Sequence, residues 1–387
     1  MRPADLPLSL YVHFPWCASK CPYCDFNSHA LRGELPEKAY AAALFKDLDI
    51  ELARSEKRPL VSVFIGGGTP SLIAPEIIEQ LLLRMRPRLA PNAEITLEAN
   101  PGSVEAGRFA AYRAAGINRL SVGVQSFNDD SLRALGRVHD ATEARAAVDT
   151  ALDTGFDRVN LDLMYALPGQ TTEMACQDAR IACQLETGHV SHYQLTLEPG
   201  TTFFKSPPKL PDDDVAWEMQ RECGRIFASS TYRHYEISAL AQPGHRCRHN
   251  LNYWLFGDYL GIGAGAHGKL TTDQGIVRRH KTKSPALYMK AMQTAGIDAD
   301  GDRQVGQQDA LFEFMLNALR LGHGFSRELF EARTGQPFSV VAQASRPAVE
   351  RGLLQIDDDW CRATPLGRRF LDDLQASFLP ASQSSVA

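Results

Sequence analysis

Short apolar runs recur along the first half of the chain. Each is followed by a longer stretch in which apolar residues return every three or four positions. Runs of the first kind are typical of buried β-strands, and stretches of the second kind are typical of amphipathic helices. The predicted strands are residues 8–14, 61–65, 94–99, 119–125, 158–166 and 190–197. Strands that alternate with helices indicate βα units and a parallel sheet.

Helices are predicted at 37–55, 75–89 and 104–116, and the last of these stops at Gly116, the residue type that most often ends a helix. Six βα units make an incomplete version of the eight-unit barrel. Polar residues gather where the predicted strands end, which is where barrel enzymes place their sites. The expected fold class is therefore α/β, with a partial (β/α)6 barrel of the TIM type over residues 1–230.

The pattern changes after about residue 200. A Pro-rich stretch, a helix near 214–230 and a Gly-rich run, GDYLGIGAGAHG, predict a connecting segment at 231–283. Beyond it the pattern is helical, and ERGLLQIDDDWCRATPLGRRFLDDL predicts a helix end, a two-stranded wing and a final helix. We expect a winged-helix-like α+β domain at 284–377 and a disordered tail at 378–387.

Composition narrows the classes of function. The 387 residues are 44% hydrophobic and 22% charged, which is ordinary for a globular protein. The net charge of -5 gives no basic field for nucleic acid or an anionic membrane. Acidic residues outnumber basic ones, 11 to 9, over 301–380, so that domain is expected to pack or to act as a lid rather than to bind DNA. Neither a membrane span nor a signal peptide is predicted, and we expect a cytoplasmic protein.

Three of the eight cysteines fall within eight residues, spaced C-x3-C-x2-C directly after the first predicted strand. They are Cys17, Cys21 and Cys24. In a reducing compartment such clustering indicates metal binding. Iron-sulfur clusters normally take four cysteines, so a triad leaves one iron open to an external ligand.

The residue at position 26, where a fourth cysteine could fall, is Phe26. Zinc is the alternative metal, since His13 or His29 could complete a four-ligand site. A barrel protein without a metal is a further alternative, but it leaves the triad unexplained.

Glycine and polar residues follow the other predicted strands. Gly67, Gly68 and Thr69 belong to GGGTP after the second strand, where glycines let the backbone approach a ligand closely. Other polar residues interrupt or follow apolar runs and are costly to bury without partners. They are Glu98, Gln125, Arg137 and Asp162. Each alone equally fits a hydrogen-bonded layer inside a barrel, but together they predict a ligand pocket.

The triad C-x3-C-x-aromatic-C on the first strand of a βα barrel resembles the radical SAM signature. E-x-N-P, GVQS, LGR and D-x4-L-P-G-Q resemble motifs of the oxygen-independent coproporphyrinogen III dehydrogenase superfamily. The resemblance implies a [4Fe-4S] cluster on the three cysteines, whose open iron binds the amino and carboxylate groups of S-adenosylmethionine. The cluster then donates an electron that cleaves the sulfonium to a deoxyadenosyl radical. The implied S-adenosylmethionine contacts are Tyr11, Tyr23, Gly67, Gly68, Thr69, Glu98, Gln125, Arg137 and Asp162.

Two functions compete within that superfamily. The dehydrogenase branch decarboxylates coproporphyrinogen III oxidatively to protoporphyrinogen IX, and it has a longer arm before the cluster strand and a further cysteine two residues after the third. Here only ten residues precede Tyr11, and Phe26 takes the cysteine's place. The HFPWC-x3-CPYCDFNSH block instead resembles the branch of HemW-type haem chaperones. That resemblance implies haem as cargo, delivered to respiratory proteins that include membrane-associated ones, and a homodimer is compatible with it.

A second motif, H-N-x-x-Y-W, resembles the proposed haem-binding segment of the HemW-type branch. Its residues are His249, Asn250, Tyr253 and Trp254. An imidazole can ligate haem iron, and aromatic rings can pack against a porphyrin. Without the resemblance, the segment fits ordinary core packing better. His245 and Cys247 are further candidate ligands, and the sequence does not choose among the three.

Overall fold

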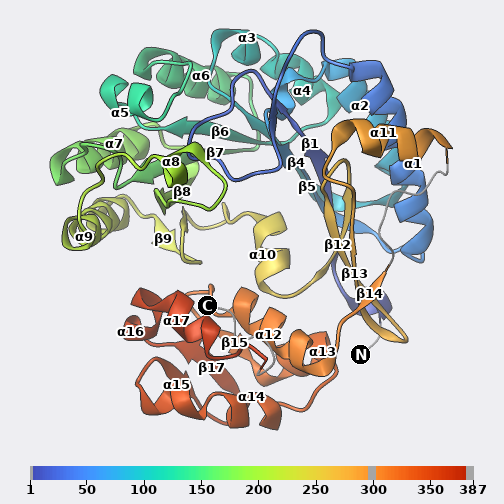
Figure 1. Cartoon of the computed structure of the whole chain (residues 1–387), viewed down its shortest axis with the longest axis vertical. Helices are drawn as coiled ribbons and strands as arrows, with labels where there is room; N and C mark the ends of the chain where they lie inside the picture. Colours follow the sequence, from blue (N-terminus) through green and yellow to red (C-terminus); the bar gives the residue numbers. More distant parts are fainter. Residues whose placement is uncertain (1–2, 295–301, 381–387) are drawn as a thin grey trace.

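One large curved sheet dominates the computed structural model, which describes residues 3–294 and 302–380. Most of the predicted tail, residues 381–387, lies outside the described residues. The sheet has twelve strands in the order β14-β13-β12-β11-β1-β4-β5-β6-β7-β8-β10-β9. Figure 1 shows it bent into an open barrel with helices along its outer face, and a separate domain, coloured orange to red, below it.

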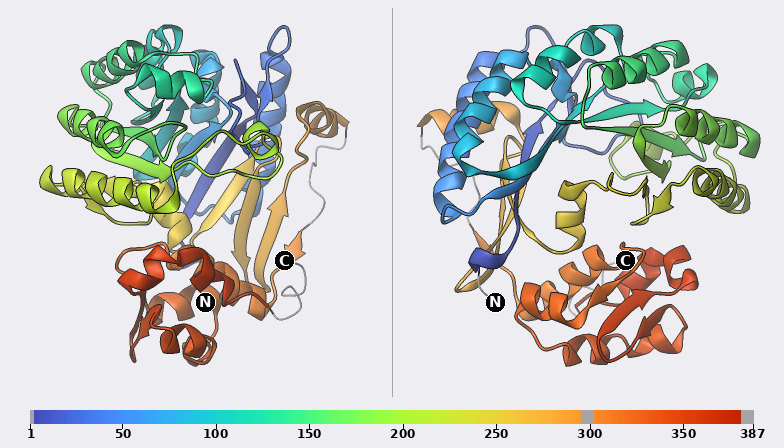
Figure 2. Two further views of the ribbon diagram at one scale, coloured as in Figure 1. Left: turned by 60° about the vertical axis from the view of Figure 1, so that its left-hand side comes forward. Right: turned by 180° about the vertical axis from the view of Figure 1, so that it is seen from behind.

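The six predicted strands are neighbours in this sheet and run parallel to one another. They are β1 (Leu8–Phe14), β4 (Leu60–Gly67), β5 (Leu89–Ala99), β6 (Arg119–Gln125), β7 (Arg158–Tyr165) and β8 (Gly188–Gln194). Parallel neighbours need crossover connections, and helices supply them on the outer face, as both views in Figure 2 show. The longest are α1 (Glu37–Arg54), α2 (Pro75–Met85), α6 (Ala141–Asp153) and α7 (Thr172–Gln184), and α9 (Asp213–Ser229) follows β8, the last of these six strands. The partial (β/α)6 barrel is confirmed.

Apolar and polar residues alternate along the strands, so the face toward the helices is apolar and the face toward the barrel interior is polar. On β6, Leu120, Val122 and Val124 belong to the core between sheet and helices. Ser121 and Gln125, on the opposite face, line a cavity inside the barrel. The helix predicted to stop at Gly116 does so: α4 (Phe109–Ala115) ends there, and the glycine has a φ of 116°.

The sheet continues past residue 230, through the segment predicted as a connection. β11 (Asp258–Ile262) pairs in parallel with β1, and β12 (His267–Thr272) and β13 (Gly275–His280) extend that edge as antiparallel strands. At the other edge, β10 (Ala239–Ala241) pairs with β8. Between them, α10 (Arg248–Trp254) lies on the concave side of the sheet (Figures 1 and 2).

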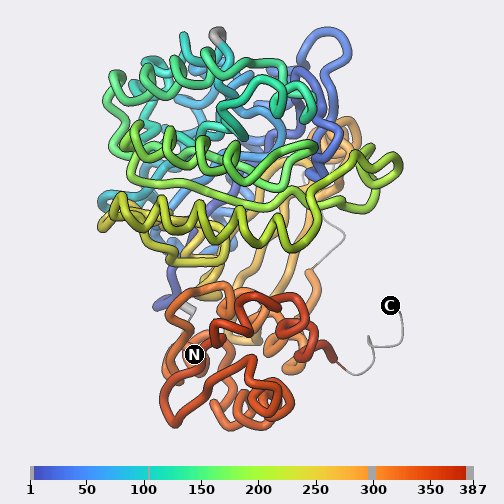
Figure 3. Tube along the Cα trace, turned by 90° about the vertical axis from the view of Figure 1, so that its left-hand side faces the viewer, coloured from blue at the N-terminus to red at the C-terminus, as the bar shows by residue number. Residues whose placement is uncertain are grey.

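The last domain has an apolar core of its own and forms a distinct body beneath the barrel (Figure 3). Its elements include α12 (Gln307–Ala318), α13 (Arg327–Thr334), β15 (Phe325–Ser326), β16 (Leu354–Ile356), β17 (Trp360–Ala363), α16 (Pro365–Arg369) and α17 (Leu371–Ala376). β16 and β17 pair as the predicted two-stranded wing, and β15 adds a third strand to the small sheet. Arg320 joins the two bodies, because its guanidinium lies 4.3 Å from the Trp254 ring and 3.1 Å from Glu236.

Candidate functional site

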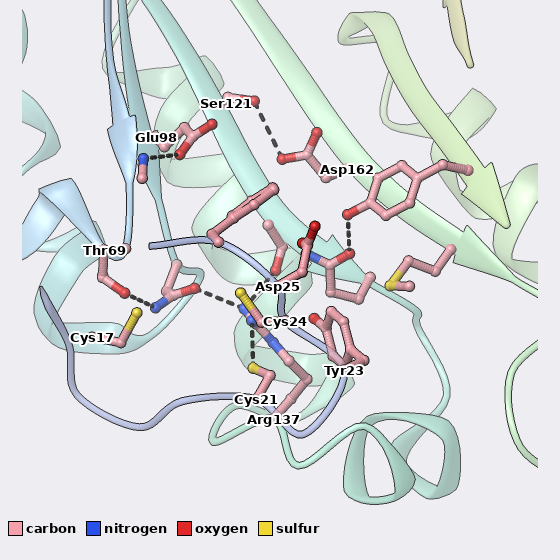
Figure 4. A pocket seen from close by; sticks show the side chains of 18 of the residues that line it. Cys17, Cys21, Tyr23, Cys24, Asp25, Thr69, Glu98, Ser121, Arg137 and Asp162 are labelled. Carbon is pink, nitrogen blue, oxygen red and sulfur yellow. Dashed lines mark hydrogen bonds between the residues drawn. The ribbon is translucent and has the colours of Figure 1, made fainter. Parts of the chain in front are cut away.

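The three clustered cysteines lie on a loop at the carboxyl end of β1. The loop is closed by two short parallel strands, β2 (Trp16–Cys17) and β3 (His29–Ala30). Lys20 ties it from within by donating hydrogen bonds to the carbonyl oxygens of Phe26 and Ser28. All three thiols are free and half-buried, and all three line the same cavity (Figure 4).

The GGGTP loop packs its backbone directly onto the cysteine strand. Gly68 N–H donates to the Phe14 carbonyl at 2.6 Å, and Thr69 N–H donates to the Trp16 carbonyl at 2.7 Å. A Cβ on Gly68 would lie 2.4 Å from the Trp16 carbonyl oxygen, which is closer than any side chain tolerates. Gly67 has a φ of 119°, in the region that favours glycine. Glycine is therefore required at both positions.

A cavity of about 390 Å³ opens beside the cysteines at the carboxyl ends of the strands. Eight of the nine residues implied to contact S-adenosylmethionine line it: Tyr23, Gly67, Gly68, Thr69, Glu98, Gln125, Arg137 and Asp162. Tyr11 is not among the lining residues. Its hydroxyl lies 2.9 Å from His13 Nδ1, and its ring stacks 6.3 Å from that of Phe64.

A hydrogen-bond network joins the cysteine loop to the cavity wall (Figure 4). Arg137 donates to Cys21 Sγ at 3.5 Å and to Asn100 Oδ1 at 2.7 Å. Asn100 in turn donates to Thr69 Oγ1 at 3.1 Å. The sequence reasoning missed Asn100 although it belongs to the E-x-N-P motif, and it also missed Tyr193, which lines the cavity. The Asn100 amide thus connects the GGGTP loop to the arginine beside Cys21.

Two carboxylates face the cavity from β5 and β7. Glu98 accepts a hydrogen bond from Gly67 N–H at 3.1 Å. Asp162 accepts from Ser121 Oγ at 3.3 Å and from Asn160 Nδ2 at 2.8 Å. Burial, and then the charge of Asp162, raise the pKa of Glu98 to about 7, and burial also raises the pKa of Asp162. A pair of buried carboxylates favours a ligand that carries positive charge.

The donor set fits an iron-sulfur cluster better than a single metal ion. In residues 3–294 and 302–380, no three His, Cys, Asp or Glu side chains are placed to hold one ion. The zinc alternative needs a histidine, but His13 uses Nε2 on the Asn27 carbonyl oxygen and Nδ1 on Tyr11. His29 is exposed and does not line the cavity. Three soft thiols around one cavity can each meet a different iron of a cluster.

The H-N-x-x-Y-W motif lies on α10, away from the cavity, and none of its four residues lines it. His249 is buried, with Nδ1 3.0 Å from Ser62 Oγ and Nε2 3.2 Å from the Tyr253 hydroxyl. Its ring stacks 5.0 Å from that of Phe64. Burial lowers the pKa of His249 to about 3, so the imidazole is neutral. Both of its nitrogens are occupied in this conformation.

The rest of the segment differs in exposure. Asn250, Tyr253 and Trp254 are half-buried. Cys247 is buried, and its thiol donates to Glu94. His245 is half-buried against Gly188.

Among the described residues, no helix is long and apolar enough to cross a membrane.

Comparison with protein families agrees with this arrangement. The model of the radical SAM superfamily matches residues 11–181, and that of the HemN C-terminal domain matches residues 305–370. Among solved structures, coproporphyrinogen III oxidase (HemN) from Escherichia coli, a radical SAM enzyme, aligns with a TM-score of 0.82 and 23% identity, over 97% of this chain and 90% of that one. The fold is thus that of HemN, and the chain contains a radical SAM domain and a HemN C-terminal domain.

Proteins of related sequence identify the family within this class. The chain is 46% identical to "Heme chaperone HemW" of Escherichia coli, over 96% of this chain and 98% of that protein. It is 47% identical to the protein of the same name from Haemophilus influenzae, with the same coverage. "Radical S-adenosyl methionine domain-containing protein 1, mitochondrial" of Bos taurus is 34% identical, over 99% of this chain and 90% of that protein. The chain belongs to the HemW family.

Proposed function

We propose that this protein is a cytoplasmic haem chaperone that holds a [4Fe-4S] cluster, binds S-adenosylmethionine beside it and delivers haem to respiratory proteins. The observation that carries the proposal is the meeting of three thiols, a glycine loop and two carboxylates around one cavity. The haem part of the proposal rests on the relationship to the HemW family. In this proposal residues 1–230 carry the cofactor site, residues 231–283 contact haem and residues 284–377 act as a lid.

Each group around the cavity has a role in the proposal. Cys17, Cys21 and Cys24 hold three irons and leave the fourth for the amino acid end of S-adenosylmethionine. The cluster, when bound, supplies a low-potential electron. The backbone of the GGGTP loop meets the amino group, while Glu98 and Asp162 meet the sulfonium and the ribose hydroxyls.

Haem is proposed to contact α10 through its half-buried side chains Asn250, Tyr253 and Trp254. His249 can ligate iron only after it leaves Ser62 and Tyr253, because both of its nitrogens are engaged there. Haem ligation is therefore coupled to movement of α10 away from β4. A reversible contact between His249 and the haem iron is suited to a carrier that must release its haem.

Replacing Ser62 with alanine tests this coupling. The variant loses the hydrogen bond to His249, worth about 1 kcal/mol, which should favour the open state and increase haem affinity about fivefold. Its hydrogen bond to Ser9 is lost in the closed and the open state alike, so that loss does not shift the balance. Titration of haem followed by Soret absorbance measures the effect. Ser191→Ala is the matched control, since that interior serine bonds to Asn160 and not to His249. His249→Ala should lose the ligated spectrum, and an unchanged spectrum in that variant would refute ligation by His249.

The whole function is tested by anaerobic reconstitution, followed by two parallel incubations. One contains haem; the other contains coproporphyrinogen III, S-adenosylmethionine and reductant. We expect charge-transfer absorbance from the cluster, one bound haem per chain and no decarboxylated product. Formation of protoporphyrinogen would make the protein a dehydrogenase. Failure to form any cluster would refute the cofactor part of the proposal.

A further inference from the structure

Arg119 is a buried cation inside the barrel, at the level of α10. It begins β6, and its side chain lies on the same face as Ser121, which lines the cavity two residues further on. The register places Arg119 beside Thr96 on β5, and Thr96 beside Phe64 on β4. The Phe64 ring stacks 5.0 Å from that of His249 on α10. Arg119 therefore belongs to the layer of the interior that lies next to α10.

This arginine lacks the anionic partner that a buried cation normally has. Its side chain is only 2% exposed. Over residues 3–294 and 302–380, no hydrogen bond and no ion pair reaches its guanidinium. Arg58 shows the usual arrangement, because it is 5% exposed and lies 2.8 Å from Asp258. A buried cation without a partner is costly and needs an explanation.

Thr96 provides a second unpaired polar group at the same level. Its side chain is fully buried, and its hydroxyl oxygen has no hydrogen-bond partner in the described parts of the chain. Buried polar groups are nearly always paired, so two unpaired ones in adjacent register positions are unusual. A guanidinium and a hydroxyl both donate hydrogen bonds, and together they fit the oxygens of one carboxylate.

The carboxylates around Arg119 are bound to other groups. Glu94 lies 3.1 Å from Arg158 and accepts two hydrogen bonds from backbone N–H groups of α10. Asp162 accepts hydrogen bonds from two polar side chains of the interior. Burial opposes the charge of Arg119, but its neighbours raise its pKa above the usual value, so the group is a cation. The guanidinium is thus charged and still able to bind an anion.

We propose that Arg119, assisted by Thr96, binds a propionate carboxylate of haem in the barrel interior and selects haem by that charge. Haem carries two propionates, and arginine pairs with carboxylates through two parallel hydrogen bonds. In the proposed function α10 moves away from β4 when His249 takes the iron, and this movement opens the layer in which Arg119 lies. The inference rests on the proposed function, because it takes haem as the ligand and His249 as the residue that brings it here.

The test compares the affinities of the full-length protein for haem and for haem dimethyl ester, in which both propionates are uncharged. Soret titration in one mild detergent measures both. The wild type should bind the ester about tenfold more weakly, because a charge-assisted bond is lost. Arg119→Met and Arg119→Gln should bind haem about tenfold more weakly and should not distinguish it from the ester. Arg119→Lys should keep part of the preference.

Thermal unfolding without haem separates ligand binding from a structural role. Arg119 has no hydrogen bond or ion pair to lose within the described residues, so Arg119→Met should keep or raise the thermal midpoint. Arg58→Met is the matched control. It breaks the pair with Asp258, so its thermal midpoint should fall while its preference for haem over the ester stays.

The outcomes distinguish the inference from the function on which it rests. An unchanged preference in both neutral Arg119 variants would overturn the inference alone, and so would equal binding of haem and ester by the wild type. A large fall in the thermal midpoint of both variants, or their failure to fold, would also overturn it, because the arginine then serves the fold. If the wild type binds neither haem nor the ester, the proposed function fails.

Discussion

Replacing Cys21 with alanine should reduce the iron and sulfide content of the reconstituted protein to background. A [4Fe-4S] cluster held by three thiolates has no spare protein ligand, and the residue at position 26 is phenylalanine. The loss of Cys21 also leaves Arg137 without its sulfur acceptor in the cavity wall. Iron and sulfide assays and visible absorbance measure the result, and binding of S-adenosylmethionine should disappear with the cluster.

Cys183→Ala is the control for that experiment. Cys183 is half-buried on α7, outside the cavity, so its variant should assemble a normal cluster. Full cluster content in the Cys21 variant would show that the triad is not the ligand set. Loss in both variants would point to general misfolding and would equally contradict the expected result.

The second large effect is expected from Gly68→Ala. The added methyl would lie 2.4 Å from the Trp16 carbonyl oxygen, so the GGGTP loop would have to move away from the cysteine strand. We expect a loss of about 3 kcal/mol in the free energy of unfolding, together with a weakened cluster. Thermal unfolding and iron content provide the measurements.

A glycine without neighbours provides the comparison for Gly68. Gly224 lies on α9, and a Cβ there would meet nothing within 4 Å. Gly224→Ala should keep the cluster and gain up to about 1 kcal/mol of stability, because alanine favours helices. Equal stability of the Gly68 variant and the wild type would show that the loop adjusts at no cost.

The sequence predicted the strands well where alternation or apolar content alone defines them. Residues 8–14 and 119–125 are strands with the predicted bounds. The second strand was predicted to end at Ile65, but pairing with β1 continues through Gly66 and Gly67. Glycines indicate a turn when read along the chain, whereas here they continue the ladder of the neighbouring strand, and Gly67 does so with a φ of 119°.

The cavity was predictable to the extent that its residues stand at strand ends. Most of the eight implied contacts line it for that reason, whereas Tyr23 lies on the cysteine loop and Arg137 follows α5 (Asp129–Ala134). Tyr11 lies earlier on β1, so its side chain projects lower in the barrel, toward His249. The burial of His249 depends on Ser62, 187 residues away, and no local pattern reveals such a contact. No local pattern reveals Tyr193 either, because its contact with the cavity wall is a hydrogen bond that its hydroxyl donates to the distant Gln125.

The pairing of β1 with β11 has a consequence for synthesis of the chain. β1 is synthesised before its partner at 258–262, whose paired residues lie 250 positions further along the chain. At roughly 5–20 residues per second, that delay is about 12 to 50 seconds. Throughout it, one edge of β1 offers unpaired backbone groups to any other nascent strand. We therefore expect this edge of β1 to need protection until β11 has been synthesised.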